Sequence, residues 1–193
     1  MADAGRVIAG TARGRRLVAP GEGTRPLADR VKQTLFAILE PDLRGAAFLD
    51  LCAGSGAAGI EALSRGAARA TFVERDRRAA NTIAENLALT GLAGPAARIV
   101  RDDAVAWLTS GAGADGPYDL VVVDPPYAEP DLLARLLGIL GADTAGRLLR
   151  PGGRVVAKHF WRERPAPRYG LLASERDRRF GETGLTFYRR EGG

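Results

Sequence analysis

The glycine-rich stretch LDLCAGSGAAG, residues 49–59, constrains the fold of this chain more than any other feature. An apolar run ends in Asp50, and a G-x-G-x-x-G spacing then begins at Gly54. A strand, a glycine turn and a helix in this order bring backbone amides and a helix N-terminus close to a ligand. Glu74 lies twenty residues after that glycine, at about the distance where an acidic side chain binds ribose hydroxyls. The stretch predicts a nucleoside-binding loop, either for a dinucleotide or for another nucleoside.

Strand-like and helix-like patterns alternate through the middle of the chain. A helical pattern follows Asp76, which is a good N-cap residue, and another begins at Pro130, which suits a first helical turn. This alternation predicts right-handed crossovers and an α/β, doubly wound, mostly parallel sheet. The run YDLVVVD is apolar on both faces, as a central strand requires. The five predicted strands are residues 46–51, 69–74, 97–100, 118–124 and 153–159.

Both ends of the chain depart from this alternation. Residues 168–175 and 183–190 predict an antiparallel C-terminal hairpin, joined by a polar turn at residues 176–182. Near the N-terminus, RVIAG and RRLVAP predict a small β-hairpin, followed by an amphipathic helix. We therefore expect a seven-stranded sheet within a single domain spanning residues 1–193. In that domain, residues 1–40 form a basic hairpin-and-helix extension and residues 41–193 form the Rossmann-like core.

The basic residues are concentrated at the two ends. The net charge is +5, and 26 of the 28 basic residues are arginine. Residues 1–30 hold six arginines against three acidic residues, and residues 150–193 hold eleven basic against five acidic residues. The first part includes Arg6, Arg13, Arg15 and Arg16. Guanidinium groups make bidentate contacts with phosphate, so these four arginines are candidate RNA contacts. A solvated surface, with arginine favoured by genome composition, is the alternative.

Other classes of protein fit the sequence poorly. The single cysteine rules out an internal disulfide, and because the chain also has only one histidine, we expect no protein-bound metal ion. The N-terminus lacks the pattern of a signal peptide, and no apolar run is long enough to span a bilayer. We expect a cytoplasmic monomer without a metal and without a membrane partner.

Acidic residues after three predicted strands indicate which ligand the glycine loop binds. Asp50 would oppose a pyrophosphate but suits the sulfonium and ammonium groups of S-adenosylmethionine. Glu74 is placed to accept hydrogen bonds from both ribose hydroxyls. Asp103, next to Ala104, is placed to accept one from an adenine amino group. The pattern therefore favours S-adenosylmethionine over a dinucleotide.

The end of the fourth predicted strand carries the candidate catalytic residues. It reads VVVDPPY, with Asp124, Pro125, Pro126 and Tyr127 after the buried run. Two prolines hold the chain in a fixed bend. We expect the Asp124 carboxylate and the Pro125 carbonyl to accept both hydrogens of a planar exocyclic amine, while the Tyr127 ring stacks on the attached base. This motif predicts methyl transfer to a base amine without a metal ion.

With these residues, the whole chain resembles a known family, the bacterial small-subunit (16S) rRNA guanine-N2 methyltransferases of the class I, Rossmann-like fold. The resemblance implies methylation of N2 of one guanine in a hairpin loop of 16S rRNA, in the small subunit or an assembly intermediate. It also implies that Arg25 and Pro26 flank the methionine end of the cofactor. The motifs are RVIAGTARGRRL, TRPLADRVKQTLF, LDLCAGSGAAGIEALSRGA, FVERD, RDDA, VVVDPPY and RRFGETGLTFYRR. The complete set of candidate cofactor residues is Arg25, Pro26, Asp50, Ala53, Gly54, Ser55, Gly56, Glu74, Arg75, Asp103 and Ala104.

Two other enzyme classes use a related motif. DNA adenine-N6 and cytosine-N4 methyltransferases share D-P-P-Y, but nothing in this chain resembles an appended DNA-recognition domain. Protein-glutamine methyltransferases also act on a planar amine, but they typically carry Asn before the two prolines, where this chain has Asp124. A non-enzymatic RNA-binding protein would have no physical need for Asp50, Glu74 and Asp124 together. We therefore expect an RNA methyltransferase.

Overall fold

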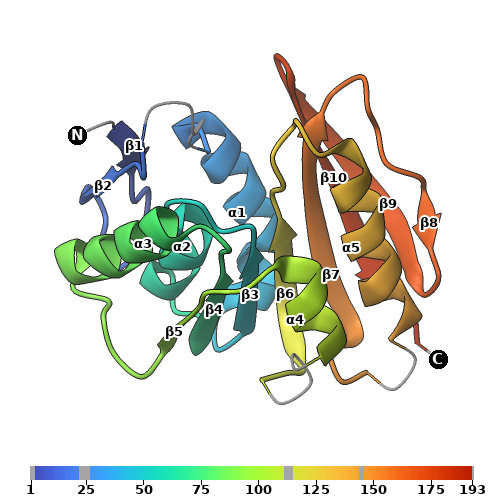
Figure 1. Cartoon of the computed structure of the whole chain (residues 1–193), viewed down its shortest axis with the longest axis horizontal. Coiled ribbons are helices and arrows are strands. Elements are labelled where there is room, and N and C mark those ends of the chain that lie inside the picture. The colour runs from blue at the N-terminus through green and yellow to red at the C-terminus, as the bar shows by residue number, and fades with distance from the viewer. Residues whose placement is uncertain (1–2, 22–26, 111–114, 144–145, 193) are drawn as a thin grey trace. The chain divides into compact units, whose positions relative to one another are not determined.

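The computed structural model describes residues 3–21, 27–110, 115–143 and 146–192. It divides into two compact units, residues 1–103 and residues 104–193. Figure 1 labels the elements of both units. The expectation of a single domain, with an extension at residues 1–40 and a core at residues 41–193, stays a prediction.

Where the structure describes it, the first unit contains a short hairpin, three parallel strands and three helices. The sheet order is β5-β4-β3, and both strand pairs are parallel. Every residue of β3 and of α2 is buried, and α2 packs against β3 and β4. The glycine loop follows the carboxyl end of β3, and Glu74 follows the carboxyl end of β4. The elements are β1 (Asp3–Arg6), β2 (Arg16–Val18), α1 (Asp29–Leu43), β3 (Ala47–Leu51), α2 (Ala57–Ser64), β4 (Arg69–Val73), α3 (Arg77–Thr90) and β5 (Ala97–Val100).

The helix α3 shows how local sequence sets an element of this unit. The Asp76 side chain accepts a hydrogen bond from the Ala79 amide at 2.8 Å, which caps the first turn. Ile83 and Leu87 are buried on one face, at the spacing of successive helical turns. Gly91 ends the helix in the left-handed conformation, with φ of 73°. The predicted N-cap and apolar face are both found.

In its described residues, the second unit contains five strands and two helices. Its sheet order is β6-β7-β10-β9-β8. The β6–β7 pair is parallel, and the remaining three pairs are antiparallel. Helix α5 packs against β7, β8 and β9. The elements are α4 (Ala104–Ser110), β6 (Tyr118–Val123), α5 (Pro130–Ala142), β7 (Leu149–Phe160), β8 (Arg168–Tyr169), β9 (Leu172–Phe180) and β10 (Thr183–Arg190).

The C-terminal strands differ from the expectation in two places. Residues 168–175, predicted as one strand, divide at Gly170, whose φ is 53° and whose added Cβ would lie 2.4 Å from the Gly141 oxygen. Only glycine fits such a position, so the chain turns there. The predicted polar turn at residues 176–182 is also wrong. Strand β9 continues to Phe180 because its backbone pairs with β10, and Gly181 and Glu182 alone form the turn. Among the described residues, and outside the small N-terminal sheet, the two units thus contribute eight strands in place of seven.

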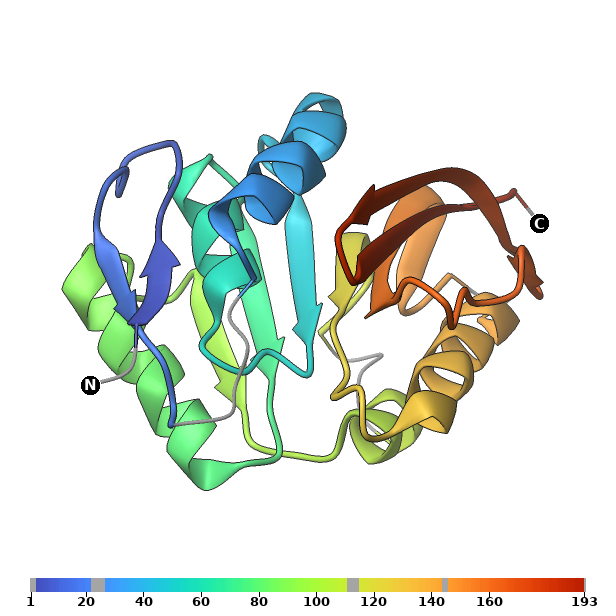
Figure 2. The ribbon, with the colours of Figure 1, turned by 90° about the horizontal axis from the view of Figure 1, so that it is seen from above.

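The N-terminal hairpin is present, but its first strand is displaced. Strand β1 covers Asp3–Arg6, whereas the prediction placed the strand at residues 6–10. The amides of Ile8 and Ala9 donate to the carboxylate of Glu61 in α2, at 2.8 and 3.0 Å, so they are not available for a strand ladder. Figure 2 shows the hairpin beside α3, against which β2 packs.

Candidate functional site

The glycine loop follows β3 and turns through left-handed backbone conformations. The φ angles of Cys52, Gly54 and Gly56 are 60°, 55° and 76°. The Ala53 amide donates to the Val73 carbonyl at 3.1 Å, which ties the loop to the end of β4. Glycine adopts left-handed φ without strain, whereas a cysteine in this region stores strain of the kind often found at binding loops.

Asp50 and Gly59 fix the helix that follows the loop. Asp50 is 2% exposed, and its Oδ2 accepts a hydrogen bond from the Gly59 amide at 2.9 Å. A Cβ on Gly59 would lie 2.3 Å from Cε1 of Phe72. The third glycine of the motif therefore permits close packing of α2 on β4. The aspartate places a negative charge beside the first turn of that helix.

Glu74 connects the loop to the next helix. Its Oε2 accepts a hydrogen bond from the Gly54 amide at 2.8 Å, and its Oε1 accepts one from the Asp76 amide at 2.9 Å. A carboxylate has about four lone-pair sites, so two further bonds are possible. The predicted binding of ribose hydroxyls is compatible with these contacts and stays a prediction.

The remaining candidate cofactor residues occupy varied positions. The Ser55 carbonyl accepts a hydrogen bond from the buried Asn86 amide group at 2.9 Å. Arg75 is exposed and Asp103 is partly buried. In the second unit, Ala104 is the buried first residue of α4. Arg25 and Pro26 lie outside the described residues.

In the second unit, the DPPY motif follows β6 directly. The Asp124 side chain is 25% exposed, Pro125 is buried and Pro126 is exposed. The ammonium of Lys158, in β7, lies 2.6 Å from Oδ1 of Asp124. The lysine therefore holds one carboxylate oxygen while the aspartate keeps an accessible face.

Tyr127 lies in the same group of side chains. The Lys158 Nζ is 5.3 Å from the centre of the tyrosine ring, within the range of a cation–π contact. The tyrosine hydroxyl is 3.4 Å from the Thr183 hydroxyl. The ring of Phe160 meets that of Tyr127 edge-on, with 6.4 Å between centroids. These contacts fix the tyrosine ring next to the catalytic candidate.

Lys158 is the residue that sequence reasoning missed. The lysine–histidine pair in the fifth predicted strand carried no diagnostic pattern. A usable signal was its rarity, because Lys32 and Lys158 are the only two lysines in a chain with 26 arginines. Adjacent side chains in a strand point to opposite faces, so His159 does not share the position of Lys158. His159 is buried, and burial lowers its pKa from the ordinary value of 6.5.

The four candidate RNA contacts lie in or beside the N-terminal hairpin. Arg6 pairs with Asp29 at 3.1 Å, and Arg16 lies 3.6 Å from Asp3 with its side chain 85% exposed. Arg13 and Arg15 are exposed. Their RNA-binding role stays a prediction.

In the part of the chain that the structure describes, no helix is both long and apolar enough to cross a membrane. Within the same residues, no cluster of three or more histidine, cysteine, aspartate or glutamate side chains could hold a metal ion.

Comparison with known proteins identifies the family. Residues 5–189 match the family model described as "Conserved hypothetical protein 95". The chain belongs to this family. The match spans both units, from the N-terminal hairpin to β10.

Two curated proteins are similar to this chain, one over nearly its whole length and one over about two thirds of it. The "Putative rRNA methyltransferase YlbH" of Bacillus subtilis (strain 168) is 37% identical over 188 residues, which are 97% of this chain and 100% of that protein. The "Ribosomal RNA small subunit methyltransferase D" of Escherichia coli (strain K12) is 46% identical over 123 residues, which are 63% of this chain and 60% of that protein.

A solved structure supports the fold assignment. The "Putative methyltransferase yhhF from Escherichia coli" has a TM-score of 0.84 and 32% identity, and the match covers 97% of this chain and 98% of that chain. The family resemblance and the Rossmann-like methyltransferase fold expected from the sequence are confirmed.

Proposed function

We propose that this chain transfers a methyl group from S-adenosylmethionine to the exocyclic N2 amine of a guanine in small-subunit (16S) rRNA. The observation that carries the proposal is the Asp124 carboxylate after β6, held on one oxygen by Lys158 and accessible beside Tyr127. Membership of a family with relatives named as rRNA methyltransferases supports the same activity.

The first unit suits S-adenosylmethionine better than a dinucleotide. Residues 50–59 contain no basic side chain to balance a pyrophosphate, and Asp50 adds a buried negative charge. The Glu74 oxygens retain acceptor sites for two ribose hydroxyls. Asp103 is assigned to the adenine, and Arg25 with Pro26 to the methionine end. When bound, S-adenosylmethionine supplies an electrophilic methyl group on a sulfonium centre.

In this proposal, the second unit binds the N2 amine of the target guanine. Lys158 occupies Oδ1 of Asp124, so Oδ2 is left to accept one N–H of the guanine amine. The Pro125 carbonyl accepts the other N–H, and the Tyr127 ring stacks on the base. These two bonds would turn the nitrogen lone pair out of conjugation with the base, which makes the nitrogen a better nucleophile. Such positioning accounts for an effect on the order of several kcal/mol.

The proposed reaction balances without a metal ion or an oxidant. With the cofactor bound, the bond between N2 and the methyl carbon would form as the bond between sulfur and that carbon breaks, and the sulfur would keep the electron pair. The methylated nitrogen then carries one proton in excess. Asp124 is the nearest proposed acceptor and releases that proton to water.

The proposed substrate is rRNA in the small subunit or in an assembly intermediate, which places the enzyme in the cytoplasm. We also propose that it acts as a monomer. The exposed arginines Arg13, Arg15 and Arg16 would contact phosphates. They contribute an affinity that is independent of base sequence.

The deciding experiment supplies labelled S-adenosylmethionine with 16S rRNA, small-subunit particles, DNA or protein in separate reactions. We expect N2-methylguanine after nucleoside analysis, from rRNA or the particle alone. The isosteric Asp124→Asn variant serves as the matched control, since it keeps the shape but loses the carboxylate. Label in N6-methyladenine, N4-methylcytosine or methylglutamine would replace the proposal with one of the alternative classes.

A binding experiment tests the cofactor assignment independently. Calorimetry should detect S-adenosylmethionine but not NAD. Glu74→Ala should weaken cofactor binding by roughly 1–3 kcal/mol, as expected for lost charge-assisted hydrogen bonds. Exposed Glu85, on α3, provides a Glu85→Ala control that should bind normally. Unchanged affinity in the Glu74 variant would show that the ribose lies elsewhere.

A further inference from the structure

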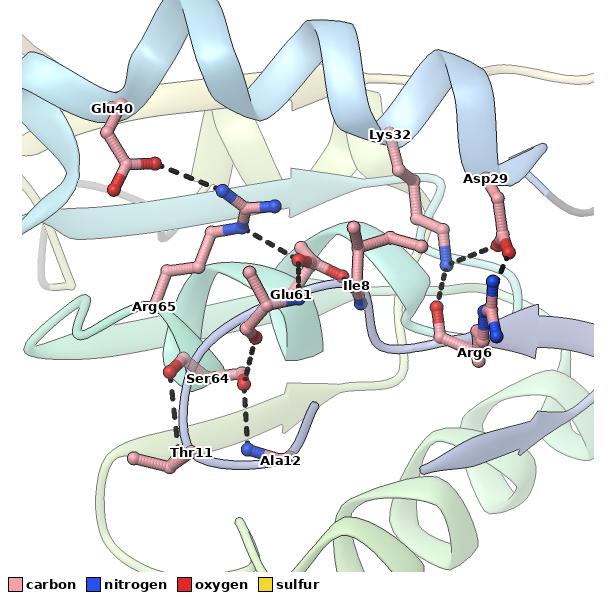
Figure 3. A network of polar contacts seen from close by, with 11 residues as sticks. Arg6, Ile8, Thr11, Ala12, Asp29, Lys32, Glu40, Glu61, Ser64 and Arg65 are labelled. Carbon is pink, nitrogen blue, oxygen red and sulfur yellow. Dashed lines mark hydrogen bonds and ion pairs between the residues drawn. The ribbon is translucent and has the colours of Figure 1, made fainter. Parts of the chain in front are cut away.

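Three helices hold the N-terminal hairpin by its backbone. Each contributes one polar side chain with no exposed surface, namely Lys32 from α1, Glu61 from α2 and Asn86 from α3. Buried polar groups need partners, and here the partners are backbone groups of the hairpin and the loop at its tip. We call residues 3–18 the arm; Figure 3 shows its contacts with α1 and α2.

Glu61 holds the loop of the arm through both carboxylate oxygens. Oε2 accepts a hydrogen bond from the Ile8 amide at 2.8 Å, and Oε1 accepts one from the Ala9 amide at 3.0 Å. The same Oε1 accepts a bond from Nε of Arg65 at 2.7 Å. A carboxylate that receives two adjacent amides fixes both the position and the direction of the loop.

One turn further along α2, Ser64 adds a second set of contacts. Its hydroxyl accepts a hydrogen bond from the Ala12 amide at 2.9 Å and donates one to the Ala9 carbonyl at 2.6 Å. Its own carbonyl accepts a bond from the Thr11 amide at 2.8 Å. A Cβ on Gly10 would lie only 1.8 Å from that carbonyl oxygen, so the loop lies directly on the helix.

The two limbs of the arm are fixed from the other helices. Lys32 donates to the carbonyl of Arg6. Asn86 accepts a hydrogen bond from the Val18 amide at 2.8 Å and donates one to the Val18 carbonyl at 2.9 Å. Asn86 also binds the Ser55 carbonyl, so one side chain contacts both the arm and the glycine loop.

The side chains on the outer surface of the arm, unlike the backbone contacts on its inner side, are exposed and basic. Arg13, Arg15 and Arg16 are exposed, and no acidic residue occurs from residue 4 to residue 21. We propose that the arm is a prefolded RNA-binding element, and that Glu61 is the positioning residue that presents these arginines to the phosphate backbone. This inference rests on the proposed function, since it concerns how the same RNA is held.

Prefolding matters because ordering a loop on binding costs conformational entropy. The anchors on α2 remove that cost before RNA arrives. They also keep the three guanidinium groups in one arrangement, so that they bind phosphates together. If the arm loses this position, the arginines still carry charge, but fewer of them bind at once.

The test measures RNA affinity against salt concentration for Glu61→Gln, using small-subunit rRNA or the particle. We expect about tenfold weaker binding at low salt and a salt slope flatter by one to two units, at roughly 0.7–0.9 per phosphate contact. The matched control is Glu40→Gln, because Glu40 also pairs with Arg65, at 3.0 Å, but is exposed and makes no contact with the arm. It should keep the wild-type slope.

A second comparison separates positioning from folding. In a background with Arg13, Arg15 and Arg16 all changed to Gln, Glu61→Gln should produce no further change in slope. Cofactor affinity should stay within a fewfold in every variant, which verifies that the first unit is folded. If Glu61→Gln does not fold, Ser64→Ala provides the milder change, with the same direction of effect expected.

Three outcomes would overturn the inference. The first is an unchanged salt slope in Glu61→Gln or, where that variant does not fold, in Ser64→Ala. The second is an equally flattened slope in Glu40→Gln. The third is a loss of slope that persists in full in the background without the three arginines. A wild-type protein that neither binds nor methylates rRNA would instead refute the proposed function, so the two failures are distinguishable.

Discussion

The two lysines of this chain are both bound to acidic partners, yet their surroundings differ. Lys32 is completely buried, donates to the Arg6 carbonyl and lies 3.6 Å from Oδ1 of Asp29. Lys158 lies 2.6 Å from Asp124, whose side chain is 25% exposed. In the first region the ammonium holds a backbone carbonyl of the N-terminal hairpin, whereas in the second it fixes the carboxylate of the DPPY motif. Exposure of the acidic partner does not separate the two pairs, since the Asp29 side chain is 35% exposed. The comparison teaches that the group bound by the ammonium, a backbone carbonyl in one case and the DPPY carboxylate in the other, distinguishes a structural lysine from one beside a candidate catalytic residue.

The largest effect is expected for the accessible carboxylate. Asp124→Ala should lower kcat by at least about 10³-fold, because positioning of the amine depends on it. Cofactor and RNA affinity should stay within a fewfold of wild type. Single-turnover methylation with labelled cofactor measures the rate of the chemical step. A near-normal rate in Asp124→Ala would show that this carboxylate is not catalytic, and the contrast between the two lysines would then have no basis.

A smaller loss is expected for the lysine beside it. Lys158→Met should lower kcat by roughly 10–100-fold, because the carboxylate loses the contact that fixes one of its oxygens. KM for RNA should change less than kcat, which a purely structural defect would not produce. Lys158→Arg should restore part of the rate if a cation is what Asp124 requires. Equal losses in the Met and Arg variants would point to packing instead.

For the other lysine the expected effect is on stability. Lys32→Met should lower the free energy of unfolding by about 2–3 kcal/mol, because the Arg6 carbonyl and nearby carboxylates lose a buried donor. The rate of the chemical step at saturating RNA should not change. Denaturant unfolding and single-turnover kinetics on the same variant test both statements. A large loss of the chemical rate would break the distinction between the two lysines.

The smallest effect concerns pH. Burial lowers the pKa of Lys32 below its ordinary value of 10.5, although Glu61 and Asp29 oppose the shift and Arg6 assists it. The folded state therefore releases this proton at a lower pH than the unfolded state. The stability contributed by the group is present above pH 10.5 and is lost as the pH falls through the lowered folded value.

The measurement compares wild type with Lys32→Met. As the pH rises toward 10.5, the wild-type free energy of unfolding should increase relative to that of the variant. Groups shared by the two proteins cancel in the difference. A constant difference across this range would mean that Lys32 keeps its proton equally in both states.

Local sequence patterns were sufficient to predict the elements that are stabilised by residues within the same segment. Helix α3 could be predicted because its cap at Asp76 and its apolar face lie within the same segment. The strand before the glycine loop and the DPPY bend are local in the same sense. They were correctly recognised as marking a Rossmann-like methyltransferase.

Contacts between distant residues explain what was missed. Gly170 interrupts a strand because it packs on Gly141, and Glu61 bonds the amide of a residue 53 positions away. Lys158 reaches Asp124 across two neighbouring strands, 34 positions apart in sequence. No periodicity within either segment encodes these pairings. The partner of a buried polar side chain becomes predictable only when the topology is known.

The anchoring of the arm has a consequence for any shortened form of this protein. Removing residues 1–20 would strip the backbone partners from Lys32, Glu61 and Asn86, all of which lie in the interior. Each stranded group costs roughly 1–3 kcal/mol, and charged groups cost more. A truncated chain would therefore aggregate or be degraded, rather than remain a folded enzyme with weakened RNA binding. Point substitutions on the outer surface of the arm separate the loss of RNA affinity from the loss of stability.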